Sequence, residues 1–86
     1  MEYRIQFVRT EASETAERLA IEKLDKLGSK YSEMISAQVF FKEEKGSNGK
    51  GKICDIRLSL PGPQIFASSD EESFEAAVAE TINDLN

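Results

Sequence analysis

This chain of 86 residues contains no histidine and a single cysteine. Without histidine, zinc sites, haem sites and general bases lose the residue that they use most often. One cysteine cannot form a disulfide within the chain. No hydrophobic run approaches the roughly 18 residues of a membrane span, and the first residues, MEYRIQFVRTE, lack the apolar core and the cleavage site of an export signal. We therefore expect a cytoplasmic protein that needs neither a metal nor another cofactor.

The composition, with 40% apolar and 31% charged residues, is that of a globular protein with a largely ionic surface. A chain of this length forms one domain, residues 1–86, around one modest core. Cys54 alternates with Ile56 and Leu58, which places it on the buried face of a strand. We expect an unreactive core thiol there, because free cysteines are mostly buried.

Alternating apolar and polar residues predict four strands, at residues 3–9, 34–42, 52–60 and 64–68. In the second strand Ala37, Val39 and Phe41 face the core, so that Phe40 points the other way. The third strand buries its even-numbered positions from 54 to 60 and exposes Asp55. The segment 46–51 is a flexible hairpin connection, and a Pro-Gly-Pro turn at 61–63 ends the third strand.

Helical spacing predicts two helices. The first follows Ser13 as its N-cap and stops at Gly28. The second follows Ser69 or Asp70 and buries an apolar face at positions 74, 77, 78, 82 and 85. This order of elements predicts a two-layer α+β sandwich, β-α-β-β-β-α, with a four-stranded sheet, two helices on one face and an open second face.

Catalytic chemistry has little support in this sequence. The adjacent carboxylates Glu43 with Glu44, and Glu71 with Glu72, lie at the ends of elements, where acids are mostly solvated. No partner base, nucleophile motif or metal-ligand spacing accompanies them. We predict a protein that is not an enzyme and has no small-molecule substrate.

The charges are distributed unevenly. All eleven bases lie between Arg4 and Arg57, whereas the residues from 59 onward carry six acids and no base, within a net charge of −5. Phosphate contacts can therefore come only from the first helix, its following loop, the strands or the hairpin. The RNA-binding candidates are Arg18, Lys23, Lys26, Lys30, Lys45, Lys50 and Lys52. The simpler interpretation of each lysine is an ordinary solvated charge.

The open face of the sheet offers a second nucleic-acid hypothesis. Phe40, with Arg57 and other polar residues around it, has the composition of a surface that stacks a base. An exposed phenylalanine is equally consistent with an edge of the core or a dimer contact.

Several short motifs occur in a fixed order along the chain: EKLDKL at 22–27, LSLPG at 58–62, FASSD at 66–70 and AAV at 76–78. Together they resemble the ribosome hibernation-promoting factors, also called ribosome-associated inhibitors or sigma-54 modulation proteins, in their short form. The resemblance covers nearly the whole chain and implies the same β-α-β-β-β-α fold and no enzymatic activity.

The resemblance implies binding to rRNA of the small ribosomal subunit near the decoding region, between head and body. The domain would exclude messenger and transfer RNA and hold ribosomes inactive under stress. Lys23 and Lys26 match positions where the family tends to have basic residues. The second helix departs from the family, because Glu80 and Asp84 stand where positive charge is usual. The alternative hypothesis is therefore a non-ribosomal protein-interaction or regulatory domain, whose acidic second helix binds a basic protein partner.

Overall fold

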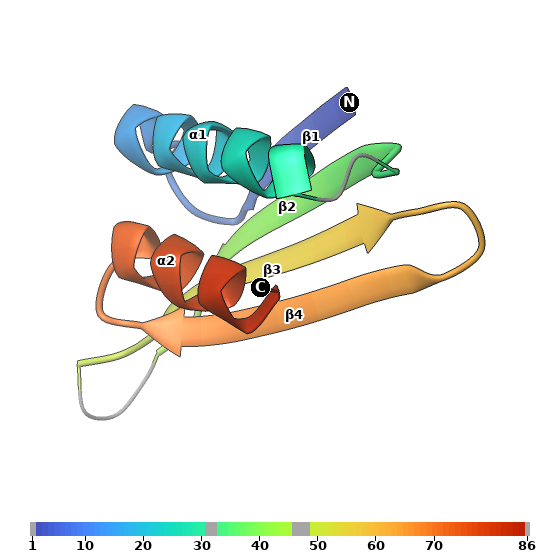
Figure 1. Ribbon diagram of the computed structural model, residues 1–86. Helices are drawn as coiled ribbons and strands as arrows, with labels where there is room; N and C mark the ends of the chain where they lie inside the picture. The colour runs from blue at the N-terminus through green and yellow to red at the C-terminus, as the bar shows by residue number, and fades with distance from the viewer. Residues whose placement is uncertain (1, 31–32, 46–48, 86) are drawn as a thin grey trace.

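The computed structural model describes residues 2–30, 33–45 and 49–85. Two helices lie on one face of a four-stranded sheet (Figure 1). The elements in chain order are β1 (Glu2–Val8), α1 (Glu14–Lys30), β2 (Ser36–Glu43), β3 (Lys52–Ser59), β4 (Gln64–Glu71) and α2 (Phe74–Leu85). The sheet order is β1-β2-β3-β4, with β1 parallel to β2 and the other two pairs antiparallel. The predicted two-layer α+β sandwich is confirmed.

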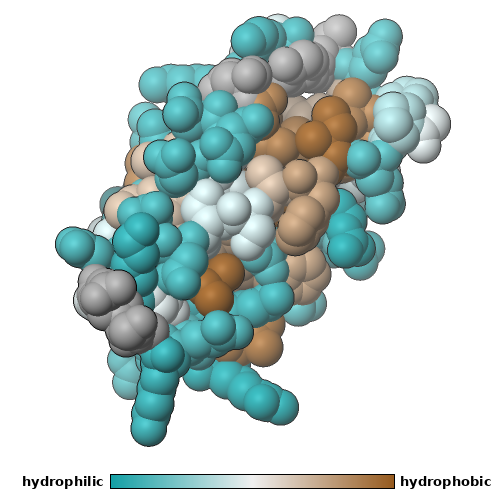
Figure 2. All heavy atoms as spheres, turned by 90° about the horizontal axis from the view of Figure 1, so that it is seen from below, coloured by the Kyte–Doolittle hydropathy of each residue, from teal (hydrophilic) through white to brown (hydrophobic). Residues whose placement is uncertain are grey.

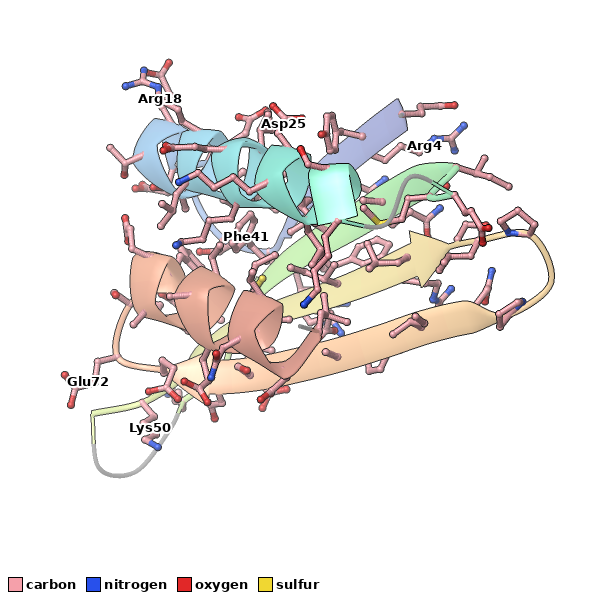
Figure 3. All side chains as sticks on the ribbon, in the orientation of Figure 1. Arg4, Arg18, Asp25, Phe41, Lys50 and Glu72 are labelled. Carbon is pink, nitrogen blue, oxygen red and sulfur yellow. The ribbon has the colours of Figure 1, made fainter. Side chains whose placement is uncertain are left out.

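The core lies between the helices and the sheet, and an aromatic cluster holds one end of it together. The Phe41 ring stacks on Phe7 at 4.7 Å between centroids and meets the edge of Phe74 at 5.2 Å. Figure 3 shows Phe41 in the layer between helices and strands. Cys54 is fully buried beside this layer, as predicted. Strand alternation therefore assigned the inward face correctly.

Serine residues cap both helices. Ser13 Oγ accepts a hydrogen bond from the Ala16 amide at 3.3 Å, as predicted. At the start of α2 the cap is Ser73, whose Oγ accepts from the Ala76 amide at 3.1 Å. The prediction of Ser69 or Asp70 as the cap is wrong, because β4 continues to Glu71.

Strand β4 is longer than predicted because it continues to pair with β3. Strand β3 offers hydrogen-bonding groups down to Lys52, which pairs with Glu71, so the chain stays extended for three residues beyond the predicted end. The Asp70 carboxylate then accepts a hydrogen bond from the Gly51 amide at 2.7 Å. The opposite end of the hairpin is the predicted Pro-Gly-Pro turn, in which Gly62 takes a φ of 96°.

Three further boundaries or environments differ from the sequence-based expectation. Helix α1 does not stop at Gly28 but runs to Lys30, since Gly28 has no positive φ with which to end it. Strand β3 ends at Ser59, and Leu60 is only partly buried. Asp55 is 8% exposed rather than solvated, because it lies in the middle of an interior strand between neighbours on both sides. The predicted hairpin connection lies partly outside the described residues.

None of the described helices has the length and apolar composition needed to cross a membrane.

Candidate nucleic-acid interface

A pair of lysines on α1 borders the groove between the two helices. Lys23 and Lys26 line a hollow of about 180 Å³ together with Leu27 and Ile82. Leu27 and Ile82 are buried, Lys23 is half-buried and Lys26 is exposed. The lysine stems can therefore lie on an apolar floor while the ammonium groups stay in water. Lys30 follows Lys26 by four residues, in the last turn of α1.

The acids of α2 are mostly turned away from this groove. Thr15 Oγ1 of α1 donates a hydrogen bond to Glu75 Oε2 at 3.1 Å, which identifies the flank of α2 that faces α1. Ile82, two turns later, lies on the same flank. Glu80 and Asp84 follow Glu75 by five and nine residues, which turns them about 140° and about 180° around the helix axis. The carboxylates that weakened the sequence-based hypothesis therefore lie on the opposite flank from the lysine pair.

Arg18 lies in different surroundings from Lys23 and Lys26. It borders an open hollow on α1 in which the other charged groups are all acids: Glu14, Glu17, Glu22 and Asp25. Figure 3 shows its side chain pointing outward from α1, away from the rest of the molecule. Four carboxylates around one guanidinium make this flank of α1 unfavourable for a phosphate. The structure thus does not bring Arg18 together with the lysine pair.

The hairpin lysines form a separate group at one end of the sheet. Lys45 and Lys50 are exposed and border a hollow of about 270 Å³ that also contains Glu43, Glu44 and Glu72. Figure 3 shows Lys50 and Glu72 at this end of the molecule, far from Arg18. The charges here are mixed, so this end lacks a purely basic surface.

Lys52 is already engaged within the protein. Its ammonium forms an ion pair with Glu43 and lies over the Phe74 ring, 5.4 Å from the centroid. It therefore helps to attach α2 to the sheet, which makes it a weaker candidate for contacting RNA than Lys45 or Lys50.

The open face of the sheet carries a cation and aromatic pair that the sequence did not reveal. Arg57 is exposed, and its guanidinium lies 5.9 Å from the centroid of the Phe66 ring on the neighbouring strand. Phe66 is 58% exposed, more than the half-buried Phe40 that the sequence had singled out. The predicted strand at 64–68 already contains Phe66, and alternation along it would have placed Phe66 on the outer face, because that face takes the even-numbered positions of β4.

Asp55, the buried charged residue on this face of the described strands, has polar partners. The Asp55 carboxylate forms an ion pair with Lys42 Nζ at 2.6 Å and accepts a hydrogen bond from the Ser68 hydroxyl. This arrangement compensates for the burial of the charge.

Among the described residues, Cys54 and Tyr3 have clearly shifted pKa values, and they do not form a reactive cluster. Burial raises the pKa of the Cys54 thiol to about 12, with a nearby Asp55 charge acting in the same direction. Burial and a hydrogen bond donated to Asp25 raise the pKa of Tyr3 to about 12. Within residues 2–30, 33–45 and 49–85, no three metal-ligating side chains come together.

Comparison with known proteins agrees with the fold and identifies the family. The family described as sigma 54 modulation protein / S30EA ribosomal protein matches residues 3–86. Since the match covers nearly the whole chain, this protein belongs to that family, and the resemblance found in its motifs is confirmed. Comparison with curated proteins gave no match.

Two solved structures share the fold. A ribosomal subunit interface protein from Coxiella burnetii is similar, with a TM-score of 0.84 and 21% identity, over 99% of this chain and 89% of that one. The N-terminal domain of Protein Y from Thermus thermophilus has a TM-score of 0.79 and 18% identity, over 99% of this chain and 91% of that one. At these identities the likeness shows the fold alone.

Proposed function

We propose that this protein is a cytoplasmic, ribosome-associated translation inhibitor that binds rRNA of the small subunit near the decoding region. Membership of a family described as ribosomal supports this role. The two similar solved structures, one of them a ribosomal subunit interface protein, have the same fold. The observation that carries the proposal for this chain is the lysine pair beside the helix groove, with Glu80 and Asp84 on the far flank of α2.

Lys23 and Lys26 would act by contacting phosphates of folded RNA. Lys23 is half-buried beside the floor formed by Leu27 and Ile82, so it loses less side-chain freedom on binding than a fully solvated lysine such as the exposed Lys26. Such contacts release counterions and supply affinity without reading sequence. The bound domain would inhibit translation by occupying space that messenger and transfer RNA need, a role that requires no catalytic residue.

Co-sedimentation with small ribosomal subunits across a salt series tests the proposal. We expect pelleting at low salt, with affinity that falls steeply as salt rises. Lys26→Glu should weaken binding several-fold and make the salt dependence shallower by about one unit of slope or more. Arg18→Glu is the matched control, because it makes the same change of charge on the same helix but on its acidic flank. It should leave pelleting nearly unchanged.

Two outcomes would overturn the proposal. No pelleting of the unmodified protein at low salt would leave the fold without a ribosomal role. The interaction of acidic α2 with a basic protein would then be the hypothesis to pursue. Equal weakening by Lys26→Glu and Arg18→Glu would show that net charge, and not the groove, determines binding.

A further inference from the structure

The open face of the sheet differs chemically from the helix side, and the proposed ribosomal role does not use it. Sixteen positions of the four strands point to this face, according to the strand register. Six of them are uncharged hydrogen-bonding residues: Gln6, Ser36, Gln38, Ser59, Gln64 and Ser68. Seen from below, Figure 2 shows apolar residues gathered toward one end of the molecule and set among hydrophilic ones.

One row of this face crosses the whole sheet and contains no carboxylate. The register aligns Arg4 with Gln38, Gln38 with Arg57 and Arg57 with Phe66. Phe40 lies two residues beyond Gln38 on the same face, in a position diagonal to Arg57 across β2 and β3. Cross-strand and diagonal neighbours at these positions are within reach of long side chains.

The acids of this face are all engaged with other groups. Asp55 pairs with Lys42, Asp70 accepts a hydrogen bond from the Gly51 amide, and Glu2 pairs with Arg4 at 3.3 Å. In the described part of the chain, Arg57 is the cation of this face that lacks a carboxylate partner. Its guanidinium lies over the ring of the highly exposed Phe66 instead.

We propose that this row, centred on Arg57 and Phe66, binds unpaired bases of single-stranded RNA. Phe66 offers its exposed ring for stacking with a base, and Phe40 offers a second ring across the sheet. Arg57 supplies a cation for the backbone between them, and Gln38 supplies amide groups that can hydrogen-bond to base edges. A surface in which apolar groups are the minority suits bases better than an apolar protein partner.

Fluorescence anisotropy with a labelled single-stranded RNA of about ten nucleotides tests this inference on the free protein, without ribosomes. We expect Phe66→Ala and Phe66→Leu each to weaken binding about tenfold or more, and Phe66→Tyr to retain it. Leucine keeps an apolar side chain but removes the ring, so it separates stacking from simple apolar contact. Ile35→Ala is the control, because Ile35 is 56% exposed and lies outside the row, before β2. Single-stranded DNA of the same sequence should also bind, because stacking does not require the 2′-hydroxyl.

A titration followed by NMR on the unmodified protein provides a second measurement that depends on no variant. Backbone shifts should concentrate on β2, β3 and β4 around Gln38, Arg57 and Phe66. Shifts confined to α1 would overturn the inference, as would wild-type binding by Phe66→Leu. If Phe66→Leu instead changed only the sedimentation coefficient of the free protein, the face would be a contact between copies and the inference would be wrong.

The inference and the proposed function can fail separately. Protein that pellets with ribosomes but does not bind the single strand at low salt overturns the inference alone. Protein that binds the single strand through Phe66 but does not pellet supports the inference and removes the ribosomal role.

Discussion

Helices α1 and α2 cover the same face of one sheet, yet their charges are arranged differently. α1 carries four acids and four bases, and their positions around the helix separate them into an acidic flank around Arg18 and a lysine flank beside the groove. α2 carries three acids and no base. The sum of the charges along a helix therefore does not describe the surface that the helix presents. A neutral helix has one strongly acidic flank and one basic flank.

The two helices have similar structural roles despite this difference. Each begins after a serine cap and buries a stripe of apolar residues against the sheet. Each also has a polar link to a strand, Tyr3 to Asp25 for α1 and Thr81 Oγ1 to the Cys54 carbonyl at 3.2 Å for α2. Surface charges other than Asp25 on α1 and Glu75 on α2 can therefore be changed without touching these attachments.

The largest expected effect comes from removing the aromatic support of α2. Phe41→Ala deletes a fully buried ring that stacks on Phe7 and contacts Phe74, the first residue of α2. We expect the free energy of unfolding to fall by about 3–5 kcal/mol, measured by urea denaturation. Phe66→Ala, on the open face, should change it by about 0.5 kcal/mol or less. A small effect of Phe41→Ala would mean that α2 does not depend on this cluster.

Alkaline pH tests the surroundings of both helices, because the Tyr3 hydroxyl that is linked to α1 and the Cys54 thiol that is buried beneath α2 both have a raised pKa. The Cys54 thiol and the Tyr3 hydroxyl ionise from about pH 9 and pH 10 in the unfolded chain, but only near 12 in the folded one. Between these values the unfolded state binds fewer protons than the folded state, so stability falls as pH rises. Below about pH 9 both groups are protonated in the folded and the unfolded state, so they do not contribute to the pH dependence of stability.

Thermal unfolding at a series of pH values checks this expectation. Cys54→Ala should flatten the decline that begins near pH 9, and Tyr3→Phe the decline that begins near pH 10. Because Tyr3→Phe removes a link to α1 that is exposed, its effect at neutral pH should be small. An unchanged decline between pH 9 and 10 in Cys54→Ala would contradict a buried thiol beneath α2.

Local sequence patterns were enough to predict the helices and strands and their inward faces. They did not predict the positions at which pairing with a distant strand overrides the local preference. Ser69 and Asp70 have the composition of a helix cap, yet β3 still offered partners to them, so they became strand. Asp55 alternates like a solvent-facing residue, but the strands on both sides cover it. On the polar face of β3 the neighbouring strands bury Asp55 but leave Arg57 exposed, and this difference depends on the sheet and not on alternation within the strand.

In the candidate site, too, the sequence identified the charged residues but not their neighbours in space. Sequence identified Lys23 and Lys26 as cations on one helix, but equally Arg18, because helical spacing does not say which flank meets a second helix. Helical spacing turns Arg18 about 140° away from Lys23, but only packing shows that Ile82 lies beneath the lysine flank. The pairing of Arg57 with Phe66 likewise depends on the register between β3 and β4.

Reversing the charge of α2 should have a small effect, and it tests whether that charge opposes ribosome binding. Glu80→Lys and Asp84→Lys reverse the two acids on the far flank of α2. Both residues are exposed, so the free energy of unfolding should change by about 0.5 kcal/mol or less. At physiological salt, charges more than about 8 Å apart are largely screened. The affinity for small subunits, measured by pelleting, should therefore rise by about twofold or less, and by more at low salt.

A tenfold gain in affinity at physiological salt would instead place the far flank of α2 against phosphate. The two helices would then contact RNA together, and the acids of α2 would oppose binding.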